Sequence, residues 1–129
     1  MKKKYLIVLA DYYKNIANGL LKSALKVIPK SITVKIIKVP GVFEIPVTIS
    51  KNIKKYDGFL ALGCVIKGET PHFDFISQAS TNAIMDLSIK NKKPIGNGII
   101  TCLNMRQAKA RKKKGAEAAN AVISILSQK

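Results

Sequence analysis

Four strand-like runs alternate with helix-like segments along this chain. Each run consists mostly of apolar or β-branched residues and lacks the strict polar alternation of a half-exposed strand. Strands of this kind belong to parallel sheets that are covered on both faces. The runs predict strands at Lys4–Ala10, Ile32–Val39, Gly58–Ile66 and Ile95–Thr101.

Apolar residues at helical spacing fill the intervals between these runs. The helices are expected at Asn15–Val27, around Ile45, Ile49 and Ile53, from Ile76 to Leu87, and at Gly115–Leu126. Strands that alternate with helices through right-handed crossovers predict a three-layer αβα sandwich around a four-stranded parallel sheet, an α/β fold of the flavodoxin-like kind. The 129 residues contain no linker or repeat, so we expect a single domain over residues 1–129.

The charge balance raises the question of a polyanionic partner. The chain carries 23 Lys and Arg residues against seven Asp and Glu, a formal net charge of +16. Only Arg106 and Arg111 are arginines, and the lysines are spread along the chain, whereas base-reading surfaces favour the planar fork of arginine. We therefore expect a solvated lysine surface and no nucleic-acid partner. The same field favours an anionic substrate.

Neither export nor membrane insertion is predicted by the sequence. The longest apolar run, Gly58–Ile66, is far shorter than the roughly 20 residues of a membrane-spanning helix. The apolar stretch after Met1–Lys4 is too short for a signal peptide, and no small-residue cleavage site follows it. Two cysteines inside apolar runs make no disulfide framework. These features predict a reduced, cytoplasmic protein without a membrane partner.

Ligands of open α/β sheets bind outside the carboxyl ends of the strands, so the residues after each run are candidates for a site. Tyr12 and Tyr13 follow the first run, where such rings also commonly pack on the rim of the sheet. Pro40–Pro46 follows the second run and combines a tight turn with Phe43 and Glu44. A glutamate in a first helical turn can also simply complement the helix dipole.

Gly68–Phe75, after the third run, is the most unusual segment of the chain. We expect Thr70 as an N-cap with Pro71 at the first helical position, and the free N–H groups of such a helix start favour an anion. His72 is the only histidine, the side-chain type best suited to proton transfer near neutral pH. A lone histidine is more often structural, and with Asp74 alone it cannot build a zinc site. Its place beside a predicted anion pocket favours a functional role.

After the fourth run come Thr101–Asn104 and then the basic run Arg111–Lys114. The basic run predicts either a solvated helix surface or a phosphate clamp, for which the bidentate geometry of arginine is suited. The four strand ends together supply two aromatic junctions, a carboxylate, a helix start suited to anions, a histidine and an arginine. Residue chemistry alone therefore predicts an α/β domain that binds a phosphorylated small molecule and a planar one.

Four segments, in order and at characteristic spacing, carry a resemblance to a known family. They are PGVFEIP at Pro40–Pro46, GCVIKGETPHFDF at Gly63–Phe75, NGIIT at Asn97–Thr101 and KGAEAA at Lys114–Ala119. The chain resembles lumazine synthase, the penultimate enzyme of riboflavin biosynthesis, over nearly its whole length. It departs from the family at Asp11, where many relatives carry a basic residue. The stretch between Arg111 and Lys114 is also shorter than in shell-forming relatives.

The resemblance implies a role for each motif. Tyr12 would stack on the pyrimidine ring of one substrate, and His72 would transfer protons. The pyrimidine and its ribityl chain would lie against Val42, Phe43, Glu44, Val65 and Ile66, with Glu44 accepting hydrogen bonds from the hydroxyls. The phosphate of the second substrate would lie in the loop of Gly68, Glu69 and Thr70. The neighbouring subunit would complete each site with Asn97, Arg111, Lys114 and Glu117, of which Arg111 would bind the phosphate.

The implied reaction joins 5-amino-6-(D-ribitylamino)uracil to 3,4-dihydroxy-2-butanone 4-phosphate. Its products are 6,7-dimethyl-8-ribityllumazine, phosphate and water, formed through an imine, loss of phosphate and ring closure, with no metal and no organic cofactor. The resemblance further implies a homopentamer with sites shared between adjacent subunits, and riboflavin synthase as a pathway partner. The short N-terminus and the shortened segment before Lys114 lead us to expect a free pentamer in place of a larger shell.

Three other functions fit parts of the pattern. A flavodoxin-like binding module would need glycine, serine or threonine in the loop after the first strand, where Asp11–Lys14 has none. A phosphoacceptor receiver domain would need an aspartate at the end of the third strand, where Cys64–Lys67 has none. A nucleic-acid-binding protein would be distinguished by a steep salt dependence of its binding.

Overall fold

Four parallel strands form the centre of the molecule. The computed structural model describes residues 3–128. In spatial order the strands are β2 (Thr33–Val39), β1 (Lys4–Ala10), β3 (Gly58–Ile66) and β4 (Ile95–Cys102). Each neighbouring pair is parallel, which confirms the sheet predicted from the sequence.

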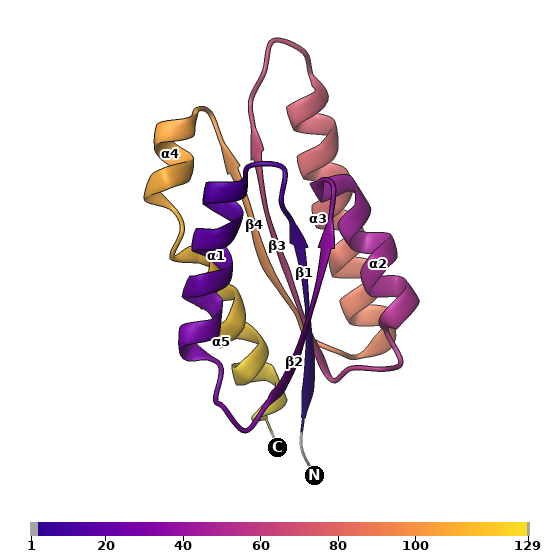
Figure 1. Ribbon diagram of the computed structural model, residues 1–129. Helices are drawn as coiled ribbons and strands as arrows, with labels where there is room; N and C mark the ends of the chain where they lie inside the picture. Colours follow the sequence, from indigo (N-terminus) through magenta and orange to yellow (C-terminus); the bar gives the residue numbers. More distant parts are fainter. Residues whose placement is uncertain (1–2, 129) are drawn as a thin grey trace.

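Helices cover both faces of this sheet. They are α1 (Lys14–Val27), the short 3-10 helix η1 (Val42–Glu44), α2 (Ile45–Asn52), α3 (His72–Asn91), α4 (Met105–Ala110) and α5 (Lys114–Leu126). Figure 1 shows α1 and α5 on one side of the sheet and α2 and α3 on the other, which confirms the three-layer arrangement. Within the described part of the chain, no helix combines the length and the apolar character needed to cross a membrane.

The position of each strand in the sheet explains its composition. β3 lies between β1 and β4, and every residue from Gly58 to Val65 is buried. β2 is an edge strand, and its exposed positions include Lys35 and Lys38. A continuous apolar strand is therefore central here, and the strand with lysines lies at the margin, where its charges remain in water.

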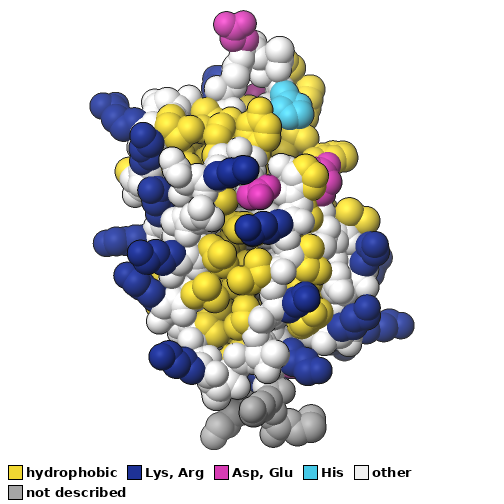
Figure 2. Space-filling model, viewed as in Figure 1, with side chains coloured by type: hydrophobic (Ala, Val, Ile, Leu, Met, Phe, Trp, Pro, Cys, Tyr) yellow, Lys and Arg dark blue, Asp and Glu magenta, His cyan; other side chains and the backbone are white. Residues whose placement is uncertain are grey.

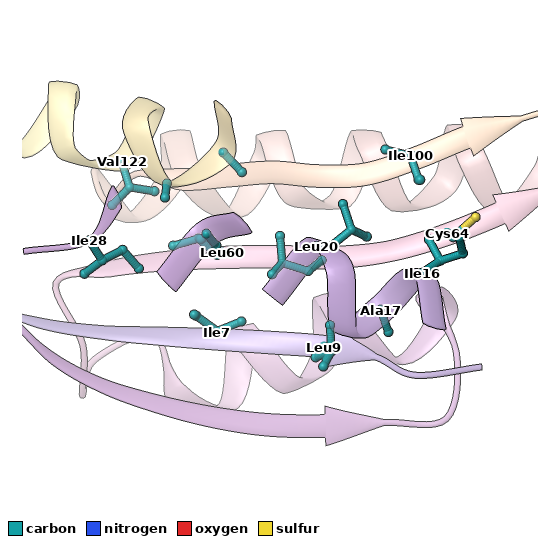
Figure 3. Packing of buried hydrophobic residues seen from close by; sticks show 14 of the residues in the cluster. Ile7, Leu9, Ile16, Ala17, Leu20, Ile28, Leu60, Cys64, Ile100 and Val122 are labelled. Atoms are coloured by element: carbon teal, nitrogen blue, oxygen red, sulfur yellow. The ribbon is translucent and has the colours of Figure 1, made fainter. Parts of the chain in front are cut away.

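The sheet separates two apolar cores. The core on the α1 and α5 side contains Leu60 and Val122, and Figure 3 shows these side chains directed into the same space as Leu20. The opposite core, under α2 and α3, contains Phe59 and Ile45. Since successive side chains of a strand point to opposite faces, the neighbours Phe59 and Leu60 serve different cores. Burial of each such side chain stabilises the fold by about 1.5–3 kcal/mol.

Two glycines allow the close packing of α5. A Cβ atom on Gly115 would collide with the carbonyl oxygen of Leu20, so the backbone of α5 touches α1 at this point. A Cβ atom on Gly96 would likewise collide with the carbonyl oxygen of Ala118, where β4 meets α5. The KGAEAA motif therefore has a packing role in addition to any role in a site.

The helix α4 was not among the expected elements, and it has only six residues. Its start is fixed by side chains: Oδ1 of Asn104 accepts from the backbone N–H of Gln107 at 2.9 Å. Oε1 of Gln107 in turn accepts from the backbone N–H of Leu103 at 2.8 Å. The basic run that follows begins as a turn, because residues 111–113 connect α4 to α5.

Candidate active site

A cavity of about 710 Å³ opens at the carboxyl end of the sheet. It is bounded by the segments that follow β1 and β2, by the end of β3 and by the first turns of α3. In Figure 2 the single histidine lies beside hydrophobic side chains at this end of the molecule. The lining residues are Tyr12, Tyr13, Gly41, Val42, Phe43, Glu44, Cys64, Val65, Ile66, His72 and Ile76.

The two tyrosines after β1 differ in how they are held. Tyr12 is 75% exposed, whereas Tyr13 is half-buried and packs against the core on the α1 side. Their ring centroids are 4.9 Å apart and the ring planes meet at 84°, an edge-to-face pair. Burial raises the pKa of the Tyr13 phenol above its ordinary value, with smaller contributions from Cys64 and Tyr12. This wall of the cavity is therefore aromatic and uncharged.

The segment after β2 supplies an aromatic ring and a carboxylate from a fixed base. Val42 is buried and anchors η1, while Phe43 is 66% exposed at the cavity. The backbone N–H of Glu44 donates to the carbonyl oxygen of Gly41 at 3.2 Å. Oε1 of Glu44 lies only 3.2 Å from where a Cβ atom of Gly41 would be, so the carboxylate folds back over this glycine. The arrangement presents hydrogen-bond acceptors beside an exposed ring.

The end of β3 forms the floor of the cavity. Val65 and Cys64 are buried, and Ile66 is half-buried. Burial raises the pKa of the Cys64 thiol to about 12, with further contributions from the nearby Cys102. The thiol is therefore protonated at neutral pH and acts as part of an apolar floor.

His72 is exposed at the start of α3 and lines the cavity. Its backbone N–H donates to Oγ1 of Thr70 at 3.4 Å, but Thr70 is not the N-cap that the sequence predicted. The helix begins one residue later than expected: Pro71, with a ψ of 7°, is the cap and lies just outside α3. Gly68, Glu69 and Thr70 are exposed above the cavity and do not line it. A Cβ atom on Gly68 would meet no atom within 4 Å.

The remaining predicted site residues lie elsewhere on the same chain. Asn97 is exposed on β4, and its Oδ1 accepts from the backbone N–H of Ile99 at 3.0 Å. Arg111 is exposed at the C-terminal end of α4. Lys114 and Glu117 form an exposed ion pair of 3.6 Å, a contact that adds little to stability. None of these four residues lines the cavity of its own subunit.

Comparison with known proteins identifies the family. A family model described as 6,7-dimethyl-8-ribityllumazine synthase matches residues 2–129. The chain belongs to this lumazine synthase family. Lumazine synthases act in riboflavin biosynthesis, so the chain is an enzyme of that pathway, a transferase that condenses two substrates.

Several bacterial lumazine synthases are similar to the chain over almost their full length. The enzyme named 6,7-dimethyl-8-ribityllumazine synthase in Agrobacterium fabrum is 42% identical over 99% of this chain and 95% of its own length. Its namesake in Bartonella bacilliformis is 44% identical over 93% of this chain and 88% of its own length. The enzyme of the same name in Bartonella henselae is 44% identical over 99% of this chain and 89% of its own length.

Four residues that line this cavity, namely Tyr13, Gly41, Cys64 and Ile76, have no role assigned by the resemblance, although Tyr13 and the turn that contains Gly41 were candidates by their position after a strand. Tyr13, Gly41 and Cys64 are chain neighbours of predicted residues, so adjacency to a strand end was the available signal. Ile76 follows His72 by four residues, a spacing that places both side chains on one face of α3. That helical spacing could have identified it.

The polar groups of the cavity suit proton transfer and hydrogen bonding. The Glu44 carboxylate is able to accept hydrogen bonds, the imidazole of His72 is a group able to give or take a proton, and the phenols of Tyr12 and Tyr13 add donors. Among residues 3–128, no three His, Cys, Asp or Glu side chains are grouped so that they could hold a metal ion. The rest of the lining is apolar or aromatic and favours a planar ring.

Proposed function

We propose that this cavity is the site where 5-amino-6-(D-ribitylamino)uracil condenses with 3,4-dihydroxy-2-butanone 4-phosphate to form 6,7-dimethyl-8-ribityllumazine, phosphate and water. One observation carries the proposal: an exposed aromatic ring, a carboxylate and a histidine from three different strand ends surround a single cavity of about 710 Å³. The family membership of the chain specifies the chemistry that such a cavity serves.

The pyrimidine substrate takes the aromatic and apolar part of the cavity. Tyr12 stacks on the ring, and the end of β3, with Val65 and Ile66, supports its opposite side. The ribityl chain extends along Val42 and Phe43, where its hydroxyls donate to the Glu44 carboxylate. Aromatic stacking with hydrogen bonds at one end fixes the orientation of the reacting amine.

The phosphate of the second substrate takes the helix start above the cavity. The loop of Gly68, Glu69 and Thr70 is open, and the first N–H groups of α3 point to this side. Arg111 of the adjacent subunit adds a bidentate, charge-assisted contact to the same phosphate. Arg111 does not line the cavity of its own chain, and in this proposal the site becomes complete only when two subunits meet.

His72 supplies the proton transfers. The amine of the pyrimidine attacks the ketone carbon, and loss of water gives an imine. Removal of a proton next to this imine expels phosphate, and ring closure with loss of water follows. His72 stands at the cavity mouth, between the pyrimidine wall and the phosphate loop, where it can carry these protons without a metal or an organic cofactor.

A homopentamer of single-domain subunits is the assembly that we propose, with each site shared between neighbours. An apolar groove of about 420 Å³ between α2 and α3 adjoins the cavity and contains the 58% exposed Val47. A second copy of this chain fits such a surface, because large exposed apolar patches mark interaction sites. The groove also includes Phe43, so the ribityl wall would lie next to the subunit contact.

The cytoplasm is the proposed location of the enzyme, with riboflavin synthase as its pathway partner, because that enzyme consumes the lumazine product. The decisive experiment mixes purified protein with both substrates and follows the absorbance and fluorescence of the lumazine. We expect a rate well above that of the substrates alone and no product when either substrate is omitted. A rate equal to the protein-free reaction would contradict the proposed function.

A further inference from the structure

Tyr13 connects the exposed ring at the cavity to the body of the protein. Its backbone is the N-cap of α1, and its carbonyl oxygen accepts from the N–H of Ala17 at 2.9 Å. Its half-buried side chain packs against the core that lies under α1. The Tyr13 ring therefore has little freedom to move relative to the sheet.

Tyr12 has no comparable support. It lies in the three-residue connection between β1 and α1, and 75% of its surface is exposed. Its ring makes an edge-to-face pair with Tyr13, with centroids 4.9 Å apart and ring planes at 84°. An exposed side chain that is not packed would divide its time among several rotamers.

The geometry of the pair is compatible with stacking of a ligand. In an edge-to-face pair, one ring directs its edge at the face of the other. If Tyr13 covers one face of Tyr12, the other face of Tyr12 stays free; if Tyr12 supplies the edge, both of its faces stay free. In either case, Tyr13 restrains the ring without occupying the surface that a planar substrate needs.

We propose that Tyr13 is a positioning residue that holds the ring of Tyr12 in the orientation required to stack on the pyrimidine substrate. This inference rests on the proposed function, because it assumes that Tyr12 stacks on that substrate. Tyr13 acts through its ring and its packing on the core, and the phenolic hydroxyl is not required. Its effect therefore falls on binding of the pyrimidine and is absent when the Tyr12 ring is absent.

The test is a double-mutant cycle read by calorimetric binding of 5-amino-6-(D-ribitylamino)uracil to the whole enzyme. Tyr13→Leu keeps apolar bulk on the core and should weaken binding about 3- to 10-fold, the range expected for loss of one aromatic pair. Tyr12→Leu should weaken binding at least as much. The double variant should bind no more weakly than Tyr12→Leu alone, because Tyr13 then has no ring to position.

Two further variants separate positioning from stability. Tyr13→Phe keeps the ring and should restore the binding that Tyr13→Leu loses, which also covers the case in which leucine impairs folding. Tyr56→Leu removes a similar edge-to-face pair, with Phe59 at 6.1 Å, outside the cavity. It should lower the thermal midpoint and leave the dissociation constant of the pyrimidine unchanged.

The outcomes of these experiments distinguish failure of the positioning role of Tyr13 from failure of the proposed function. Equal losses from Tyr13→Leu in the wild-type and Tyr12→Leu backgrounds would overturn the positioning role and leave stacking by Tyr12 intact. If Tyr13→Phe binds the pyrimidine as weakly as Tyr13→Leu does, the positioning role of the Tyr13 ring is likewise overturned, and stacking by Tyr12 again stays intact. Unchanged binding in Tyr12→Leu would instead contradict the stacking role in the proposed function, and the inference with it.

Discussion

His72 combines a restrained backbone with an exposed side chain. The first turn of α3 and the hydroxyl of Thr70 hold its backbone, while the imidazole borders both the cavity and the open loop before it. A proton carrier needs this combination, because it must reach several positions on the reacting substrates without a change in the fold.

Replacement of His72 by alanine should therefore affect chemistry more than binding. We expect the turnover number of His72→Ala to fall roughly 10²-fold, near the low end for loss of a general acid–base group, because imine chemistry proceeds slowly unaided. Calorimetry should show nearly unchanged binding of the pyrimidine. Asp74→Asn, on the same helical turn but outside the cavity lining, serves as the control. An unchanged turnover number for His72→Ala would remove this residue from the mechanism.

Cys64 illustrates how a buried group makes stability depend on pH. Its pKa of about 12 means that the folded thiol keeps its proton, whereas the thiol of the unfolded chain loses it above about pH 8.5. The unfolded state then binds fewer protons than the folded state. The free energy of unfolding is thus unaffected by Cys64 below about pH 8.5 and decreases as the pH rises from there toward 12.

Urea unfolding at about pH 8 and about pH 10, at a fixed protein concentration, measures this decrease. The wild-type chain should lose about 1–2 kcal/mol more stability between the two pH values than Cys64→Ala does. The comparison of slopes cancels the effect of alanine on packing, which is the same at both pH values. Parallel losses in the two proteins would show that Cys64 ionises equally well in the folded state.

Among the elements, β3 was predicted with its correct bounds, whereas α4 was not predicted at all. The predicted bounds of β3, Gly58–Ile66, agree with the structure, because a central parallel strand is apolar throughout and its ends are marked by a change of composition. α4 has no apolar stripe, since Ala108 is the buried residue in its six. Its one usable signal was the spacing of Asn104 and Gln107, which resembles a capping box.

Some residues of the candidate site could also be predicted from the sequence, and others could not. Residues that directly follow β1, β2 and β3 could be predicted, because the carboxyl ends of parallel strands meet at one edge of the sheet. Whether Arg111 reaches a cavity could not be predicted from such positions, because in the proposed assembly it depends on a contact between subunits. The sequence also contained no rule that separates Tyr12, which is exposed, from Tyr13, which is packed on the core.

The packing of α5 leads to a prediction about Gly115. Gly115→Ala forces a methyl group against the Leu20 carbonyl oxygen and should lower the free energy of unfolding by about 1–3 kcal/mol. Gly68→Ala is the matched control, because Gly68 has open space around its Cβ position and no positive φ. Its effect on stability should stay within about 0.5 kcal/mol. Denaturation in urea measures the free energy of unfolding of both variants. Equal losses of stability in Gly115→Ala and Gly68→Ala would contradict the packing role of Gly115.

At the scale of the whole molecule, the proposed sharing of each site between two subunits predicts complementation between impaired variants. His72→Ala and Arg111→Ala should each be impaired, and Arg111→Ala should raise the KM of the phosphorylated substrate far more than that of the pyrimidine. When the two variants are unfolded together and reassembled as a ring, about one quarter of the sites should regain both side chains. Activity should rise accordingly above that of either variant alone. No gain would place both residues in the site of one chain.

The mass of the particle tests the assembly itself. Head-to-tail contacts that share a site must close into a ring or continue as a filament, and we expect a free pentamer. The formal charge of +16 on each subunit opposes the packing of rings against one another, although salt screens this repulsion beyond about 8–10 Å. Mass photometry at physiological salt should show five subunits. A particle twelve times heavier would indicate a shell, and an active monomer would refute shared sites.

The order of the elements along the chain determines when each core can close during synthesis. The core under α2 and α3 draws on segments that are made early, up to Ile84, apart from contributions by β4. The core under α1 also needs Ala118, Ala119 and Val122 of α5, which the ribosome adds after every strand. Until then, α1 alone covers this side of the nascent sheet, and the apolar surface that α5 buries stays exposed. Exposed apolar surface of this kind makes a newly made chain prone to aggregation until its last helix is in place.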